Sequence, residues 1–195
     1  MPAQIDRDTV LEKLKPWLEN KDTIKVGHNL KYDSHIFSNY GLNLQGQVFD
    51  TMMLSYVNNS IATRHNLGAV AKRYLNINPS SYEDVAGKGA KQISFQQVGI
   101  EEATFYAAED ADISLQLHHV LTPDLKKQTA LYDLYTNVEE PLIVPALEAV
   151  GDGLVWGLDD CAAHVGVPCV AALDGVDDGS EGGSAHEDEH RREDH

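Results

Sequence analysis

The feature that most constrains the fold of this chain is a helical pattern over residues 101–121 with a carboxylate on its apolar side. Apolar or small residues recur there at steps of three and four, as on one face of an α-helix. The stripe consists of Ala103, Ala107, Asp110, Ile113 and Leu117. A buried carboxylate without a partner is costly, so we expect Asp110 to have a cation or strong hydrogen-bond donors nearby.

A second carboxylate has the same kind of placement. In Asn29-Leu-Lys-Tyr-Asp33, Asp33 follows Asn29 by four residues, as Asp110 follows Tyr106. This spacing puts both side chains of a pair on one face of a helix. The expected apolar side of this second helix consists of Asp33, Ile36, Phe37 and Tyr40. Two such carboxylates on different helices suggest a shared metal site. Taken alone, the two stretches also fit a helix start with a surface acid and a core tyrosine beside a salt-bridged acid.

The composition indicates one globular domain with an additional segment. The chain has 195 residues, 42% of them hydrophobic, which suffices for one core. No apolar run reaches the roughly 20 residues that span a bilayer, and the first residues do not resemble a secretory signal, so no membrane contact is expected. Both cysteines, Cys161 and Cys169, lie late in the chain. The expected folded part therefore needs no disulfide, which is compatible with a cytoplasmic protein.

The net charge of −16 is unevenly distributed along the chain. From Gly151 onward there are 12 acidic and 2 basic residues, and before it 19 acidic and 13 basic. Neither part has the basic excess of an autonomous nucleic-acid binder. A metal-assisted nuclease is not excluded, because its site must itself be acidic. Residues 151–195 are rich in Gly and Asp without a clear period, which predicts an acidic, low-complexity, disordered tail.

The order of expected elements indicates an α/β fold, with strands and helices early and helices later. Strands are expected at 24–27 and 47–49, and helices at 9–19, 29–41, 50–56, 65–75, 101–121, 125–138 and 141–150. Residues 76–94 predict a loop, and Pro123 is expected to end the long helix. Asp50 is expected to cap a helix rather than bind metal.

Five segments together closely resemble the 3′–5′ proofreading exonuclease domain of bacterial DNA polymerase I, the Klenow-type family A enzyme. They are Lys25-Val-Gly-His-Asn-Leu-Lys-Tyr-Asp33, Phe49-Asp-Thr-Met52, Arg64-His65, Ala86-Gly-Lys-Gly89 and Tyr106-Ala-Ala-Glu-Asp-Ala-Asp112. They occur in the order and at the spacing of that family. The resemblance implies a ribonuclease-H-like fold, mostly helical in its second half. Residues 1–138 would form part of the exonuclease domain, and 139–150 would begin the passage to a polymerase domain.

The resemblance also implies a role for each candidate residue. The family's site uses four carboxylates and a tyrosine to hold two divalent metals about 4 Å apart, Mg²⁺ or else Mn²⁺ or Zn²⁺. Asp33 and Asp110 would be metal ligands, and Tyr106 would orient the attacking water. The single-stranded 3′ end of DNA would be contacted by His28, Asn29, Tyr32 and Arg64. His28 stands where the family often has glutamine.

One departure from the family pattern bears on activity. The family's first motif is Asp-x-Glu on an early strand, and no aspartate of this chain is followed two residues later by glutamate. Two metal-binding carboxylates, the N-terminal strands that carry them and the polymerase domain are therefore expected to be missing. The metal site would then be incomplete and the isolated chain a weak nuclease, unless a complementing polymerase chain supplies the ligands.

Two other hypotheses remain open at this point. The chain would be a non-catalytic scaffold or single-strand-binding remnant of a polymerase. Alternatively, it would be a gene fragment without a selected function. In that last case, a sheet edge left open by the missing strands would make it prone to aggregate.

Overall fold

Helices make up most of the structure, a computed structural model that describes residues 4–143 and 171–173. The helices are α1 Arg7–Leu18, α2 Leu30–Ser38, α3 Thr51–Asn58, α4 Leu67–Tyr74, α5 Tyr82–Ala86, α6 Ile100–Lys126 and α7 Thr129–Leu134. Short 3-10 turns lie at Gly89–Lys91, Phe95–Gln97 and Glu140–Leu142, and a π-helical turn at Tyr135–Glu139. In the described part of the chain, no helix is long and apolar enough to cross a membrane.

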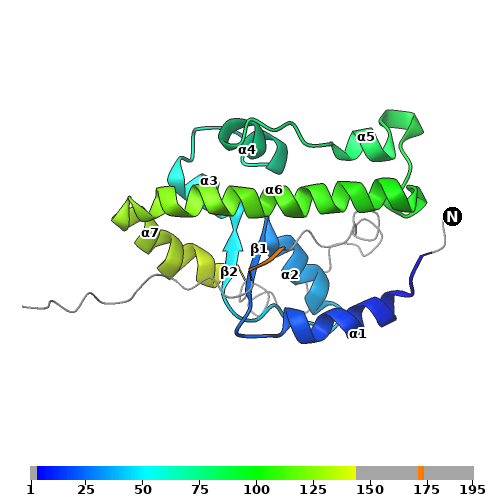
Figure 1. The fold of residues 1–195 in the computed structure, drawn as a ribbon, viewed down its shortest axis with the longest axis horizontal. Coiled ribbons are helices and arrows are strands. Elements are labelled where there is room, and N and C mark those ends of the chain that lie inside the picture. The colour runs from blue at the N-terminus through cyan, green and yellow to red at the C-terminus, as the bar shows by residue number, and fades with distance from the viewer. Residues whose placement is uncertain (1–3, 144–170, 174–195) are drawn as a thin grey trace, which may run out of the picture.

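A small mixed sheet lies on one side of the long helix α6, together with α1 and α2, while α4 and α5 lie on the other (Figure 1). Strand β1, Ile24–Gly27, is central and pairs in parallel with β2, Val48–Asp50. On its other edge β1 pairs antiparallel with β3, Ala171–Leu173. The two strands expected from the sequence are confirmed, β2 being shifted by one residue.

Strand β3 corrects the expected tail at three positions. Residues 171–173 belong to the segment predicted to be disordered, yet they pair with β1, with Ala172 opposite Lys25 and Ala171 opposite Val26. The rest of the predicted tail lies outside the described residues. The predicted helix at 141–150 lies outside them beyond Ile143, and its first residues form part of a 3-10 turn.

The main core forms where α6 meets α3, α4 and β1. The expected stripe of α6 is buried at Ala107, Asp110, Ile113 and Leu117, and it continues through Leu121 and Leu125. Of these side chains, Ile113, Leu117, Leu121 and Leu125 pack with Val26, Phe49, Leu54 and Val70. The predicted amphipathic pattern of the long helix is therefore confirmed, and it places the middle of α6 over the sheet.

The predicted end of the long helix at Pro123 is wrong. Helix α6 continues to Lys126, with Pro123 inside it and exposed. A proline lacks the N–H that would bond one turn back, but its fixed φ is compatible with a helix. Leu121 and Leu125 on either side are fully buried. Their burial outweighs the loss of one hydrogen bond, so tertiary packing overrides the local stop signal.

The predicted loop at 76–94 is also wrong in part, because it contains α5 and a 3-10 turn. Ser81 caps α5 in a reciprocal arrangement with Asp84. The Ser81 N–H donates to Asp84 Oδ2 at 2.8 Å, and the Asp84 N–H donates to Ser81 Oγ at 3.3 Å. The Ser-x-x-Asp spacing is the sequence signal for such a cap. Ala86 at the end of α5 packs against Phe95 and Val98.

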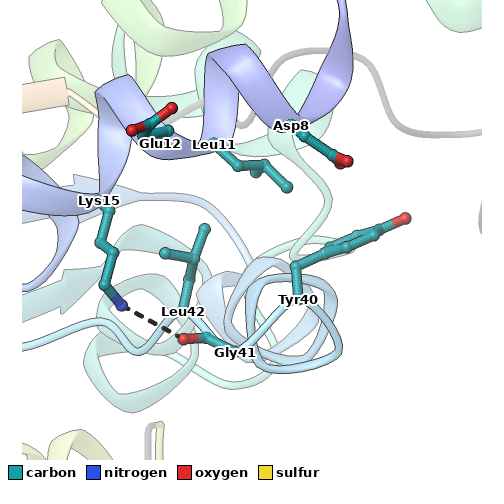
Figure 2. Close-up of a pocket in the computed structure, with 7 residues that line it drawn as sticks. All are labelled: Asp8, Leu11, Glu12, Lys15, Tyr40, Gly41 and Leu42. Carbon is teal, nitrogen blue, oxygen red and sulfur yellow. Dashed lines mark hydrogen bonds between the residues drawn. The ribbon is translucent and has the colours of Figure 1, made fainter.

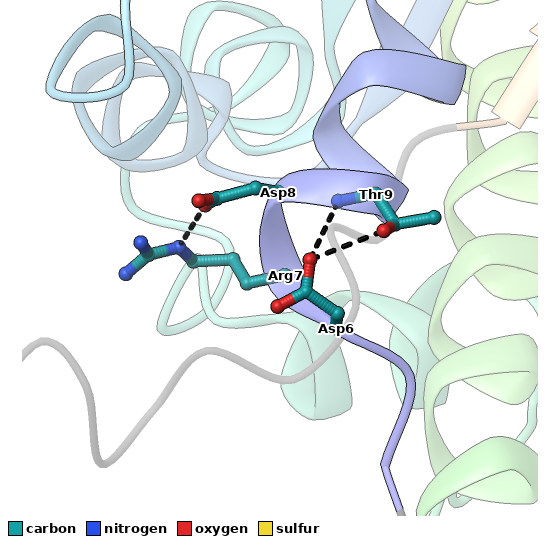
Figure 3. A network of polar contacts seen from close by, with 4 residues as sticks. All are labelled: Asp6, Arg7, Asp8 and Thr9. Atoms are coloured by element: carbon teal, nitrogen blue, oxygen red, sulfur yellow. Dashed lines mark hydrogen bonds and ion pairs between the residues drawn. The ribbon is translucent and has the colours of Figure 1, made fainter.

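Helix α1 begins two residues earlier than predicted, at Arg7, because Asp6 caps it (Figure 3). Asp6 Oδ1 accepts from the Thr9 N–H at 3.0 Å and from Thr9 Oγ1 at 3.1 Å. Arg7 Nε donates to Asp8 Oδ1 at 2.9 Å on the exposed side of the same turn. This cap serves one helix only.

Candidate functional site

A single buried carboxylate joins the starts of two helices. Asp50 is the last residue of β2 and is fully buried. Its Oδ1 accepts from the N–H groups of Met52 at 2.9 Å and Met53 at 3.4 Å, which confirms the expected cap of α3. The same Oδ1 accepts from the Asn29 N–H at 2.9 Å, and Oδ2 accepts from the Leu30 N–H at 2.9 Å. Asp50 therefore also holds the start of α2, which the sequence did not indicate.

The start of α2 depends on this outside carboxylate. Asn29, the residue before the helix, has the left-handed φ of 63° and makes no side-chain cap of its own. Asparagine is one of the few residues other than glycine that adopts this conformation readily. The first N–H groups of a helix have no partner inside it, and Asp50 supplies the acceptor that Asn29 does not.

His28 is held inside the protein by both ring nitrogens. Nδ1 lies 2.9 Å from Thr51 Oγ1, and Nε2 lies 2.9 Å from the carbonyl oxygen of His65. Burial lowers the pKa of His28 to about 4, so the ring is neutral at pH 7. Because a carbonyl only accepts, the one N–H of the neutral ring belongs on Nε2. Nδ1 then carries a lone pair and faces the Thr51 hydroxyl, whose single proton is directed to the Gly27 carbonyl. The predicted contact of His28 with DNA stays a prediction.

Asp33 lies in the first turns of α2, where it is half-buried. Burial, together with the nearby Asp50 charge, raises its pKa from 3.8 to about 7. Both causes disfavour the ionised carboxylate. Burial also raises the pKa of Asp50, while its backbone donors oppose that shift. On the predicted apolar side of α2, Phe37 is buried as expected, but Tyr40 lies beyond the end of the helix and is exposed.

The two candidates on α6 lie one turn apart. Asp110 is buried, with 9% of its surface exposed, as the stripe predicted. Tyr106 is half-buried and packs beside Phe95, with ring centroids 6.0 Å apart. Ser114 Oγ donates to the Asp110 backbone carbonyl at 2.8 Å, one turn further along. The helix thus presents Tyr106 and Asp110 from a rigid, packed element.

The remaining predicted DNA-binding residues are exposed. Tyr32 on α2 and Arg64 before α4 both face solvent, and Asn29 is exposed as well. The hydrogen bond from His28 to the His65 carbonyl ties the Arg64-His65 segment to the residue that precedes Asn29. The structure therefore brings the Arg64 segment to the start of α2, although 35 positions separate Arg64 from Asn29.

The described side chains do not fit the two-metal site that the resemblance implies. Within residues 4–143 and 171–173, no three histidine, cysteine, aspartate or glutamate side chains gather where an ion would be held. Asp33 lies near Asp50, but both oxygens of Asp50 are engaged by backbone N–H groups. Asp33 and Asp110 are the two metal ligands that the resemblance implies, and the described residues add no third metal ligand.

Sequence reasoning missed the residues that support this region. Thr51 Oγ1 lies 3.1 Å from the Gly27 carbonyl oxygen as well as near His28, and Ser55 Oγ lies 3.0 Å from His65 Nδ1. Tyr135 Oη accepts from the Asp50 N–H at 3.2 Å. The available sequence signal for this supporting region was the position of Asp50, directly after a strand and directly before Thr51. Nothing local pointed to Tyr135, which is 85 positions away.

An open pocket of about 300 Å³ lies elsewhere, between α1 and the end of α2 (Figure 2). Its lining residues are Asp8, Leu11, Glu12, Lys15, Tyr40, Gly41 and Leu42. Lys15 Nζ donates to the Gly41 carbonyl at 3.4 Å at its edge. None of the predicted site residues lines this pocket, so it is separate from the candidate site.

Comparison with known proteins identifies relatives of the described region. The model of a family described as 3′-5′ exonuclease matches residues 1–126. A DNA polymerase I of Pseudomonas aeruginosa is 45% identical over 152 residues, covering 77% of this chain and 16% of that protein. DNA polymerase I of Rhizobium leguminosarum is 38% identical over 150 residues, covering 76% and 15%. That of Chloroflexus aurantiacus is 37% identical over 143 residues, covering 72% and 15%. The chain thus spans about a sixth of the length of these relatives.

Proposed function

This chain belongs to the 3′–5′ exonuclease family of DNA polymerase I, and from that membership we propose that it is part of a proofreading exonuclease acting on DNA 3′ ends. The observation that carries the proposal is the geometry of α2. Asp33 lies on a helix whose start is fixed to the end of β2 by Asp50, and the exposed Asn29 and Tyr32 lie beside it. This arrangement suits a single-stranded end laid across the start of α2.

The proposed reaction is hydrolysis of the terminal phosphodiester. Water attacks the phosphorus, the bond to the 3′ oxygen of the preceding nucleotide breaks, and the last nucleotide leaves with its 5′ phosphate. Tyr106 would orient the attacking water, and Asp33 and Asp110 would be two of the acidic groups around it. His28, Asn29, Tyr32 and Arg64 would hold the single-stranded end.

The proposal includes reduced activity for the isolated chain. Exonucleases of this family generally depend on divalent metal, Mg²⁺ being our expectation, but the described donor set does not fit two ions. The Asp-x-Glu pair is absent from the sequence. Misplacement of a reacting group by about 1 Å costs on the order of 100-fold in rate. We therefore propose turnover far below that of a complete domain unless another polymerase chain adds the missing carboxylates.

We also propose how the chain divides into domains. Residues 1–138 would be part of a ribonuclease-H-like exonuclease unit, and 139–150 the start of the passage to a polymerase domain. A cytoplasmic location, where chromosomal DNA is replicated and repaired in bacteria, belongs to the proposal as well. The mostly helical structure with its small sheet supports this description.

A second candidate function is a non-catalytic scaffold or single-strand-binding module. The absent Asp-x-Glu pair and the lack of a three-ligand group among the described residues favour it. The two candidates share the DNA surface at the start of α2 and differ only in turnover. Binding without hydrolysis would therefore support this second function.

The deciding experiment is digestion of a 5′-labelled single-stranded oligonucleotide with Mg²⁺ or Mn²⁺. The variants are Asp33→Ala and Asp110→Ala, and Asp112→Ala is the matched control because Asp112 is exposed on the same helix. A slow ladder shortening from the 3′ end, lost in both variants and kept in the control, supports the exonuclease. A ladder that persists in both variants, or none at all, overturns it for the isolated chain.

A further inference from the structure

Asp50 makes more backbone hydrogen bonds than one helix cap requires. A cap residue ordinarily accepts from one or two N–H groups of the helix that follows it. Asp50 accepts from two N–H groups of α3 and from the N–H groups of Asn29 and Leu30, which lie 21 and 20 positions earlier. The surplus bonds all go to the start of α2.

The surroundings of Asp50 fix its carboxylate in place. Its residue pairs with Gly27 across the parallel β1–β2 ladder, and its own N–H donates to Tyr135 Oη. The side chain is fully buried, so water does not compete for its oxygens. A negative charge at a helix start is favourable, and here one charge serves two starts.

Three of the proposed site residues, Asn29, Tyr32 and Asp33, lie at the start or in the first turn of the helix that Asp50 holds. Asn29 precedes α2, and Tyr32 and Asp33 follow within four residues. Asn29 makes no side-chain cap bond, and the N–H groups at the start of α2 bond to Asp50 instead. Any tilt of this turn would move Tyr32 and Asp33 together.

We propose that Asp50 is a positioning residue for the candidate exonuclease site, acting through α2 rather than on DNA. Its bonds to the Asn29 and Leu30 N–H groups set the orientation of Asn29 and Asp33, while its bonds to Met52 and Met53 serve stability. The consequence for DNA rests on the proposed function, but the coupling of Asp50 to α2 does not.

Two substitutions separate these two tasks. Asp50→Ser keeps a good cap for α3, because serine is one of the preferred cap residues. Serine has a shorter side chain with only one oxygen, so it does not reach the N–H groups of α2. Asp50→Asn keeps one acceptor oxygen for Oδ1 and replaces Oδ2, so it disturbs the bond to Leu30 first. Asp6→Ser is the matched control, since Asp6 caps α1 alone.

The test is amide hydrogen exchange followed by NMR, with fluorescence-detected binding of a labelled oligothymidylate as the second readout. In Asp50→Ser we expect exchange at Asn29 and Leu30 to accelerate about tenfold or more, the effect of losing a hydrogen bond of usual strength, while Met52 and Met53 change little. Oligothymidylate affinity falls in the same variant and is partly rescued in Asp50→Asn. Asp6→Ser leaves both readouts unchanged.

Two outcomes overturn the proposal. One is that amide exchange accelerates equally at Asn29, Leu30, Met52 and Met53 in Asp50→Ser and in Asp50→Asn. Asp50 would then stabilise the whole fold rather than position α2. The other is no acceleration at Asn29 and Leu30. Exchange is measured without DNA, so a wild-type chain that fails to bind oligothymidylate would count against the proposed function and leave the exchange result to decide the role of Asp50.

Discussion

The Nζ of Lys25 and the carbonyl oxygen of Gln45 lie 2.6 Å apart inside the protein, where Lys25 is fully buried. Nζ also donates to the carbonyl oxygens of Thr23, at 3.1 Å, and Asn20. An ammonium group has three protons, so these three acceptors satisfy it. Burial lowers the pKa of Lys25, as expected for a cation taken from water. The side chain ties the α1–β1 loop to the α2–β2 loop.

Removing this ammonium group should destabilise the fold. Lys25→Met keeps much of the side-chain volume but leaves three carbonyl oxygens without their donor, and we expect a loss of about 3 kcal/mol. The measurement is the free energy of unfolding from urea titration. Lys13→Met, at an exposed position on α1, is the control and should change it by less than about 0.5 kcal/mol. A Lys25→Met variant as stable as the control would contradict the assigned role.

Two glycines with similar backbone angles should respond differently to alanine. Gly46 has a φ of +87°, and a Cβ there would lie 2.7 Å from the Thr23 carbonyl oxygen and 2.8 Å from that of Lys21. Gly41 has a φ of +70° but open space around a Cβ. Gly41→Ala should cost about 1–2 kcal/mol from the left-handed backbone alone, and Gly46→Ala clearly more. Thermal unfolding of the pair measures the difference, and equal losses would refute the predicted clash.

Loss of the Tyr135 hydroxyl should weaken the support of Asp50. Tyr135→Phe keeps the ring that stacks with Phe49, with centroids 6.4 Å apart, but leaves the buried Asp50 N–H without its acceptor. We expect a loss of about 1–3 kcal/mol in unfolding free energy. Tyr132→Phe on α7 is the control. If the two variants are equally stable, the Tyr135–Asp50 hydrogen bond contributes nothing.

Asp33 should make stability depend on pH. Its pKa is about 7 in the folded protein and 3.8 without burial, so between these values the folded state binds more protons than the unfolded state. The contribution of Asp33 to stability must then fall as pH rises from about 4 to 7. Asp33→Asn should be more stable than wild type at pH 8, by about 1–2 kcal/mol for a half-buried group, and equal to it near pH 3.

Urea unfolding of both proteins at pH 3, 5.5 and 8 measures this difference. Other groups titrate in the same range, but they are common to the two proteins and cancel in the comparison. A stability difference that stays constant across the three pH values would show that Asp33 is not the group responsible.

Local sequence signals predicted much of the fold and part of the site. Sequence patterns located β1, α2, α4 and the stripe of α6, and the position of Asp50 predicted its cap of α3. The bonds from Asp50 to α2 were not predictable, because they join residues about 20 positions apart through tertiary packing. The burial of Lys25 was hidden for the same reason, since its three acceptors are backbone carbonyls that carry no sequence signal. The prediction that Pro123 ends the long helix was wrong because the burial of Leu125 depends on tertiary packing, which the local sequence does not show.

The position of α6 determines when this protein can fold during synthesis. Its core residues Ile113, Leu117, Leu121 and Leu125 pack over Val26, Leu54 and Val70, which precede them by 43 to 99 positions. These earlier side chains stay without their packing partner until Leu121 and Leu125 have left the ribosome. Helices α1 to α4 form only transiently before then, because short helices are marginal without tertiary contacts. Cooperative folding is therefore delayed until nearly the whole described region has been translated, and a stalled, shorter nascent chain would be a substrate for chaperones and proteases.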